Sequence, residues 1–84
     1  MTRLINIGFN NTIPLDRVLV ILKPESAPIK RYIAEVKKSN MVIDATYGRR
    51  TRSVIVLDTG HLVMSSVQPE TVSNRANNKP LADE

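Results

Sequence analysis

The stretch SVIVLDTGHLVMSSV, residues 53–67, decides how this chain folds. It holds two runs of strand-forming residues, 53–58 and 61–67, joined by a tight connection in which Gly60 supplies the positive φ of a short hairpin loop. The run VIVL within it is apolar at every position, which is typical of a strand buried on both faces. Residues 53–67 therefore predict an antiparallel hairpin that needs cover on two sides.

A second fully apolar run, VLVIL at residues 18–22, lies in a predicted strand 17–23. The chain offers one strong helix pattern, about 13 residues and roughly 20 Å long, which covers one face of a small sheet and not two. Two solutions remain: the sheet closes on itself as a barrel or sandwich, or another copy of the chain covers the second face. The second solution is the preferred hypothesis.

The helix is predicted within PESAPIKRYIAEVKKSN, residues 24–40. Pro24 ends the preceding strand, Ser26 or Ala27 caps the helix, and Pro28 is tolerated in the first turn. The apolar stripe holds Ile29, Tyr32, Ile33 and Val36, and the opposite basic arc holds Lys30, Arg31, Lys37 and Lys38. The pattern indicates an apolar inner face and a basic outer face.

The remaining elements complete an α+β domain of order β-β-α-β-β-β. They are a strand at 4–9, a turn at 10–12, a strand at 41–45 and one or two helical turns at 69–76. The last three strands are expected to form an antiparallel meander because their connections are short. The prediction is a single domain over residues 1–74, with a small, mostly antiparallel sheet, one main helix, a short C-terminal helical turn and a disordered tail at 75–84.

The loop TYGRRTR, residues 46–52, carries the main functional signal. Gly48 allows a left-handed turn, so Arg49 and Arg50 are expected to project from a hairpin tip, with Arg52 at the root of the next strand. Guanidinium groups pair with phosphate oxygens and reach guanine edges or a narrow minor groove. The pattern indicates a nucleic-acid contact, and a solvated charged turn is the alternative.

Charge and aromatic content favour duplex DNA as the partner. The chain has 12 basic and 8 acidic residues, a net charge of +4, with one Phe, two Tyr and no Trp. Proteins that bind single strands and RNA stack bases on aromatic side chains, so their scarcity favours a duplex read through its backbone and groove shape.

Signals for catalysis are weak. The chain has no cysteine and one histidine, His61, and it contains neither a Walker loop nor a GxGxxG motif. Asp44 near Tyr47 would form an acid–base pair only with a raised pKa and a deep pocket, for which a chain of this size has little room. We expect Asp44 instead to bond a nearby backbone N–H or an arginine. The sequence predicts no enzyme, cofactor, metal site or small-molecule substrate.

The N-terminus lacks the long apolar region of a signal peptide, and no apolar run approaches the roughly 20 residues that cross a bilayer. These features predict a cytoplasmic protein without a membrane partner.

Four segments resemble one known family. They are INIGF (5–9), PESAPIKR (24–31), IDATYGRRTR (43–52) and VQPETV (67–72), and they are similar to segments of the extracellular matrix regulatory, RemA-like proteins. The resemblance covers most of residues 4–73. It implies a ring-shaped, octamer-like homo-oligomer with duplex DNA on its outside, associated with the nucleoid, that activates genes for biofilm matrix or osmoprotection.

The resemblance also implies residue roles. It places DNA contacts at Arg17, Arg49 and Arg50 and a role in subunit packing at Pro28. The charge pattern adds Arg52, with secondary phosphate contacts at Lys30 and Arg31. Asp16 is expected to weaken the phosphate contact of its neighbour Arg17.

Three rival functions remain open. A structural or adaptor oligomer would bind acidic proteins through a basic rim. An RNA-binding module would stack bases on Tyr32 and Tyr47. A deep pocket around Asp44 would favour an enzyme.

Overall fold

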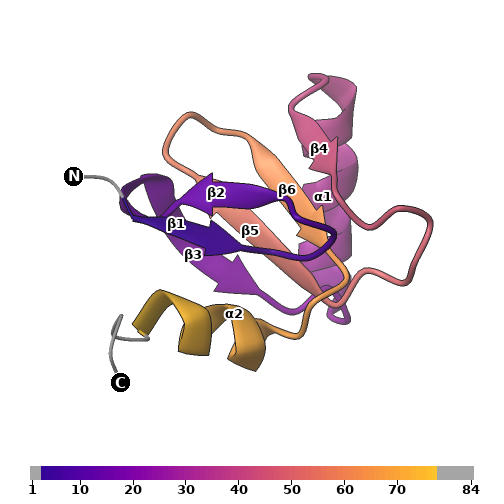
Figure 1. Cartoon of the computed structure of the whole chain (residues 1–84). Helices are drawn as coiled ribbons and strands as arrows, with labels where there is room; N and C mark the ends of the chain where they lie inside the picture. Colours follow the sequence, from indigo (N-terminus) through magenta and orange to yellow (C-terminus); the bar gives the residue numbers. More distant parts are fainter. Residues whose placement is uncertain (1–2, 78–84) are drawn as a thin grey trace.

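Two β-sheets and two helices make up the domain, which confirms the predicted α+β class (Figure 1). The computed structural model describes residues 3–77. The elements are β1 (Leu4–Asn6), β2 (Thr12–Pro14), the 3-10 turn η1 (Leu15–Arg17), β3 (Val18–Leu22), α1 (Ala27–Lys38), β4 (Val42–Asp44), β5 (Ser53–Leu57), β6 (Leu62–Ser65) and α2 (Pro69–Asn77). The larger sheet has the strand order β3-β5-β6-β4, and β1 and β2 form a separate antiparallel pair.

The hairpin predicted at residues 53–67 is present as β5 and β6. The two strands pair antiparallel, with Ile55 opposite Val63, and Gly60 in their connection has φ +93°. The N–H of Gly60 donates to the carbonyl oxygen of Leu57 at 3.0 Å, which closes the turn. These two strands are the centre of the larger sheet.

Both faces of that centre are covered within one chain. Figure 1 shows β1 and β2 crossing one face of the sheet and α1 lying behind it. The core on the β1–β2 side contains Ile5, Ile7, Ile13, Ala45, Ile55, Val63 and Val72. Side chains alternate along a strand, so Val54 and Val56 point to the α1 side, and both are buried as well. The preferred hypothesis that another copy must cover a whole face is therefore wrong at β5, because the N-terminal strand pair supplies the second cover.

The uncovered apolar surface lies at one edge of the sheet. β3 is an edge strand, and its register with β5 shifts between Val18 and Val20, which is the mark of a β-bulge. The side chain at the bulge, Leu19, is 67% exposed, and Val20 is 41% exposed. Only part of the apolar run 18–22 therefore packs inside the chain.

Helix α1 begins as predicted, and its cap is Ser26, whose Oγ accepts a hydrogen bond from the N–H of Ile29 at 3.3 Å. Within the apolar stripe, Ile29, Ile33 and Val36 are half-buried, and Tyr32 is exposed. No residue of α1 is fully buried. The helix therefore packs against the sheet through a narrow line of side chains.

The predicted antiparallel meander is wrong at its first strand. β4 pairs with β6 in parallel, and β6 separates β4 from β5 in the sheet. Residues 45–52 are therefore a crossover between non-adjacent strands, and not the hairpin loop that the sequence predicted. The sequence prediction also missed β2, because a short strand that ends at Pro14 has a weak strand pattern.

The C-terminal helical turns are confirmed as α2, which buries Val72 completely. The helix lies next to β1 and β3 and runs to Asn77, beyond the predicted domain boundary at residue 74. The rest of the predicted tail, 78–84, lies outside the described residues. Across residues 3–77, no helix is both long and apolar enough to span a membrane.

Candidate nucleic-acid interface

The arginine loop, residues 45–52, is tied at both ends to the same strand. The N–H of Ala45 donates to the carbonyl oxygen of Met64 at 2.9 Å, and the N–H of Arg52 donates to that of Ser65 at 2.8 Å. The two acceptors are consecutive residues of β6. The base of the loop is therefore fixed to the centre of the sheet.

Asp44 shapes the start of this loop. Its Oδ1 accepts hydrogen bonds from the Oγ1 of Thr46 at 2.6 Å and from the N–H of Thr46 at 2.9 Å. These bonds favour the ionised form, and they hold the pKa of Asp44 below its ordinary value. The expectation that Asp44 bonds a nearby backbone N–H is confirmed.

The tip of the loop has the left-handed turn expected at Gly48. Tyr47 and Gly48 have φ +54° and +80°, and the N–H of Arg49 donates to the carbonyl oxygen of Thr46 at 3.0 Å. Arg49 and Arg50 follow this turn, and both are exposed. The turn therefore delivers two guanidinium groups to the surface.

Three arginines surround one hollow. Arg49, Arg50 and Arg52 line a cavity of about 420 Å³ together with Phe9 and Ser66. Within residues 3–77, none of these three arginines forms a salt bridge. No carboxylate of the described residues lines this hollow, which suits an anionic group such as a phosphate.

Phe9 belongs to this surface, and the sequence analysis missed it. Its ring centroid lies 4.8 Å from that of Tyr47, and the Cζ of Arg49 lies 5.9 Å from the Phe9 centroid. Both distances are in the range of favourable aromatic and cation–π contacts. Phe9 was predicted as the last residue of a strand at 4–9, but the strand ends at Asn6 and Phe9 lies in the turn that follows.

Lys30 and Arg31, the two predicted secondary phosphate contacts, differ in their distance from the arginine loop. Lys30 and Arg50 line a shallow hollow of about 250 Å³, together with Glu25, Pro24 and Thr51. Arg31 is exposed on α1 but does not line either arginine hollow. The structure therefore brings Lys30 to the arginine loop.

Pro28 lies exposed in the first turn of α1. Its predicted role in subunit packing stays a prediction.

Arg17 lies away from the other arginines within one chain. It precedes β3 and adjoins the end of β5, whereas Arg52 precedes the start of β5. The five residues of β5 span about 17 Å at the usual strand rise. The guanidinium of Arg17 also forms a salt bridge of 3.2 Å with Asp58, a partner that the sequence analysis did not consider.

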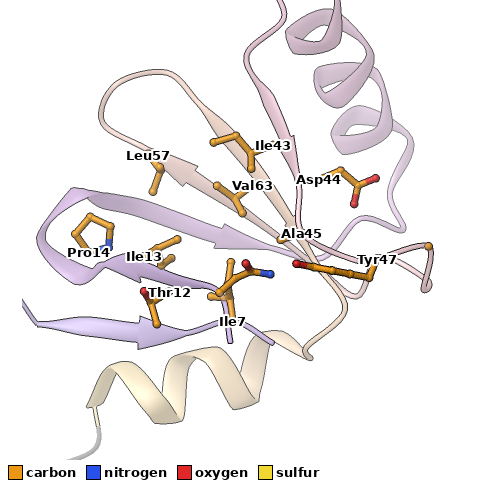
Figure 2. Close-up of a pocket in the computed structure, with 12 residues that line it drawn as sticks. Ile7, Thr12, Ile13, Pro14, Ile43, Asp44, Ala45, Tyr47, Leu57 and Val63 are labelled. Carbon is orange, nitrogen blue, oxygen red and sulfur yellow. The ribbon is translucent and has the colours of Figure 1, made fainter. Parts of the chain in front are cut away.

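A larger, mainly apolar hollow lies between β2 and β4 (Figure 2). It has a volume of about 660 Å³ and is broadly open to solvent, so the chain has more room for a hollow than the sequence indicated. Its lining includes Pro14 and Ile43 as well as Asp44. Figure 2 shows the carboxylate of Asp44 turned away from Ile43 and Val63. With a lowered pKa, Asp44 differs from the raised-pKa carboxylate that the acid–base hypothesis required.

The other titratable candidate, His61, lies next to the β5–β6 turn. Its Nδ1 is 2.7 Å from the Oγ1 of Thr59. Within residues 3–77, no cluster of three or more His, Cys, Asp or Glu residues is placed to hold a metal ion.

Comparison with known proteins agrees with the segments quoted above. The model of the RemA-like family, described as extracellular matrix regulatory protein A-like, matches residues 4–76. A protein of Thermoanaerobacter sp. (strain X514) is 58% identical over 83 residues, which cover 98% of this chain and 86% of that protein. A protein of Carboxydothermus hydrogenoformans is 54% identical over 82 residues, which cover 98% of this chain and 94% of that protein. A Synechococcus protein is 60% identical over 74 residues, covering 88% of this chain and 83% of that protein. The names of all three contain the words "regulatory protein".

Proposed function

The chain belongs to the RemA-like family of extracellular matrix regulatory proteins, and from this premise we propose that it regulates transcription by binding duplex DNA through the arginine loop. The observation that carries the proposal is the hollow of about 420 Å³ lined by Arg49, Arg50 and Arg52. The genes expected to respond are those for biofilm matrix or osmoprotection.

Phosphate contacts dominate the proposed binding. The guanidinium groups of the loop match phosphate oxygens, and Lys30 adds charge beside Arg50. Each neutralised phosphate releases counterions, so log K falls with log[salt] by about 0.9 per contact. Sequence preference then comes mainly from how easily the duplex deforms.

We further propose that copies assemble head to tail into a closed ring. Two different surfaces support this proposal: the exposed β3 edge at Leu19 and Val20, and the apolar hollow at Pro14 and Ile43. Contacts between unlike surfaces generate rings when the rotation closes. A ring multiplies modest arginine contacts, because linked sites bind together with far higher avidity.

Light scattering tests assembly and DNA capture together. The purified protein is measured alone and with a duplex of about 100 base pairs, in roughly 0.15 M salt. Arg50→Ala is expected to keep the assembly size and to weaken duplex binding at least about 10-fold. Lys38→Ala removes the same charge from α1, where Lys38 pairs with Glu35, and serves as the control. If Arg50→Ala bound the duplex as tightly as the parent, the loop would not be the DNA site.

One observation favours a second candidate function, the binding of single-stranded RNA. Phe9 and Tyr47 are exposed rings beside three arginines, which is the chemistry of a base-stacking platform. The sequence placed this stacking on Tyr32 and Tyr47, whereas the structure puts the ring of Phe9 beside Tyr47. Competition separates the functions: single-stranded RNA displaces the duplex if RNA is the ligand, and polyglutamate displaces it if the basic surface serves acidic proteins.

A further inference from the structure

Two aromatic residues adopt backbone conformations that bulky side chains rarely take. Phe9 has φ +53° and Tyr47 has φ +54°. The other non-glycine residues with positive φ in the described part of the chain are Asn10 and Asn40, and asparagine tolerates this region. The backbone at Phe9 and Tyr47 is therefore strained, and the strain needs a physical reason.

Burial in the core does not supply that reason. Phe9 is 44% exposed and Tyr47 is 68% exposed, so each ring keeps much of its surface in solvent. The two strained residues come from segments far apart in the sequence, and their rings contact each other at 4.8 Å. Both strained positions thus meet at one contact, at the rim of the arginine hollow.

The turn that carries Phe9 is firmly anchored. The Oδ1 of Asn6 accepts from the N–H of Gly8 at 2.8 Å, and the N–H of Asn11 donates to the carbonyl oxygen of Gly8 at 2.9 Å. Gly8 also packs closely, because a Cβ there would lie 3.1 Å from the Cγ2 of Val67. Phe9 is therefore a fixed support, whereas the tip of the arginine loop has no other ring contact within residues 3–77.

We propose that Phe9 is a positioning residue that holds the arginine loop in the shape in which it binds DNA. Its ring fixes Tyr47, and its face holds the guanidinium of Arg49. This inference rests on the proposed function for its DNA readout, but the ordering of the loop is a property of the free protein. Removing the ring frees both Tyr47 and Arg49. The loop must then be ordered when DNA binds, and the entropy cost of this ordering lowers the affinity.

Phe9→Asn tests the proposal, because asparagine suits the left-handed backbone and lacks the ring. Hydrogen exchange of the amides of residues 47–51 is measured without DNA, together with thermal unfolding and duplex affinity. We expect unchanged or higher thermal stability, exchange at 47–51 faster by about 5-fold or more, and duplex affinity lower by about 5-fold. Phe9→Tyr keeps the ring and is expected to match the parent, as is Tyr32→Ala on α1.

The outcomes separate this inference from the proposed function. A parent protein that ignores duplex DNA overturns the proposed function, and faster exchange in Phe9→Asn then still supports the positioning role. A parent that binds duplex, with Phe9→Asn equal to it in exchange and affinity, overturns the inference alone. A lower melting temperature that accompanies weaker binding also overturns it, because Phe9 would then serve the stability of the fold.

Discussion

Ser53 and Ser65 lie directly opposite each other on β5 and β6, both are fully buried, and they differ completely in their hydrogen bonds. The Oγ of Ser65 donates to the carbonyl oxygen of Ile7 at 2.7 Å and accepts from the N–H of Val67 at 3.0 Å. The Oγ of Ser53 has no partner within residues 3–77. Ser65 thus ties Ile7, which follows β1 and lies two residues before Phe9, to the centre of the sheet.

Ser65→Ala is expected to lower the free energy of unfolding by about 1–3 kcal/mol, because it leaves the buried carbonyl oxygen of Ile7 and the half-buried N–H of Val67 without their partner. Ser53→Ala is the matched control, and it is expected to leave stability unchanged or slightly raised, since it removes a buried hydroxyl that has no hydrogen-bond partner in the described part of the chain. Urea denaturation of the two variants measures the difference. Equal destabilisation by both substitutions would contradict this assignment of roles.

Leu19→Asp is expected to break the assembly without unfolding the subunit. Leu19 sits on the bulge of an edge strand and is 67% exposed, so the isolated chain gains little from its side chain. Burying a leucine between subunits contributes about 1.5–3 kcal/mol per interface. Light scattering at micromolar concentration reports the loss of size, and circular dichroism checks the fold.

The control for Leu19 is Leu4→Asp, a substitution at a leucine of β1 that is 62% exposed. It is expected to leave the assembly intact. Full-size assemblies of Leu19→Asp would remove the β3 edge from the interface.

Asp58→Asn is expected to strengthen duplex binding about 2- to 5-fold, because it releases the guanidinium of Arg17 from a salt bridge of 3.2 Å. Arg17→Ala is expected to act in the opposite direction. Glu70→Gln changes the net charge equally on α2 and controls for long-range attraction. Fluorescence anisotropy with a labelled duplex measures all three, and equal affinities for Asp58→Asn and Glu70→Gln would show that Arg17 does not contact DNA.

Thr46→Val is expected to raise the pKa of Asp44 toward its ordinary value near 3.8, because the side-chain hydrogen bond from Thr46 is the largest cause of its lowered pKa. A carboxyl with a lowered folded-state pKa stabilises the fold above the unfolded-state value. The stability advantage of the parent over the variant is therefore present at neutral pH and shrinks as the pH falls below about 4. Carboxyl NMR titration and urea denaturation at two pH values measure these effects. If the difference in unfolding free energy between parent and variant persisted in acid, it would come from packing of Thr46 and not from the ionised Asp44.

The strongest local patterns predicted structure correctly. The two apolar runs around Gly60 form the β5–β6 hairpin, and the helix begins where Ser26 and Pro28 indicate. The sequence did not predict the parallel pairing of β4 with β6. After α1 the chain could pair with any strand of the sheet, and no local sequence pattern indicates which one. β2 escaped prediction because its stability comes from covering the sheet and not from its own residues.

The site was predicted in part. Gly48 predicted the left-handed turn and the exposed arginines correctly, since turn chemistry and charge are local properties, whereas the hairpin expected around them is a crossover. The contact between Phe9 and Tyr47 joins two distant segments, and the salt bridge between Arg17 and Asp58 joins two others, so neither was visible as a pattern. Non-local contacts of this kind follow from topology.

The loop at residues 45–52 connects β4 to β5, and its two ends hydrogen-bond to neighbouring residues of β6, Met64 and Ser65. Such a closed base makes the tip an interchangeable module: residues added or exchanged between Tyr47 and Thr51 change how far the arginines reach, and the strands beneath stay as they are. One scaffold can thus present its guanidinium groups at different distances from the sheet through a few substitutions in this loop.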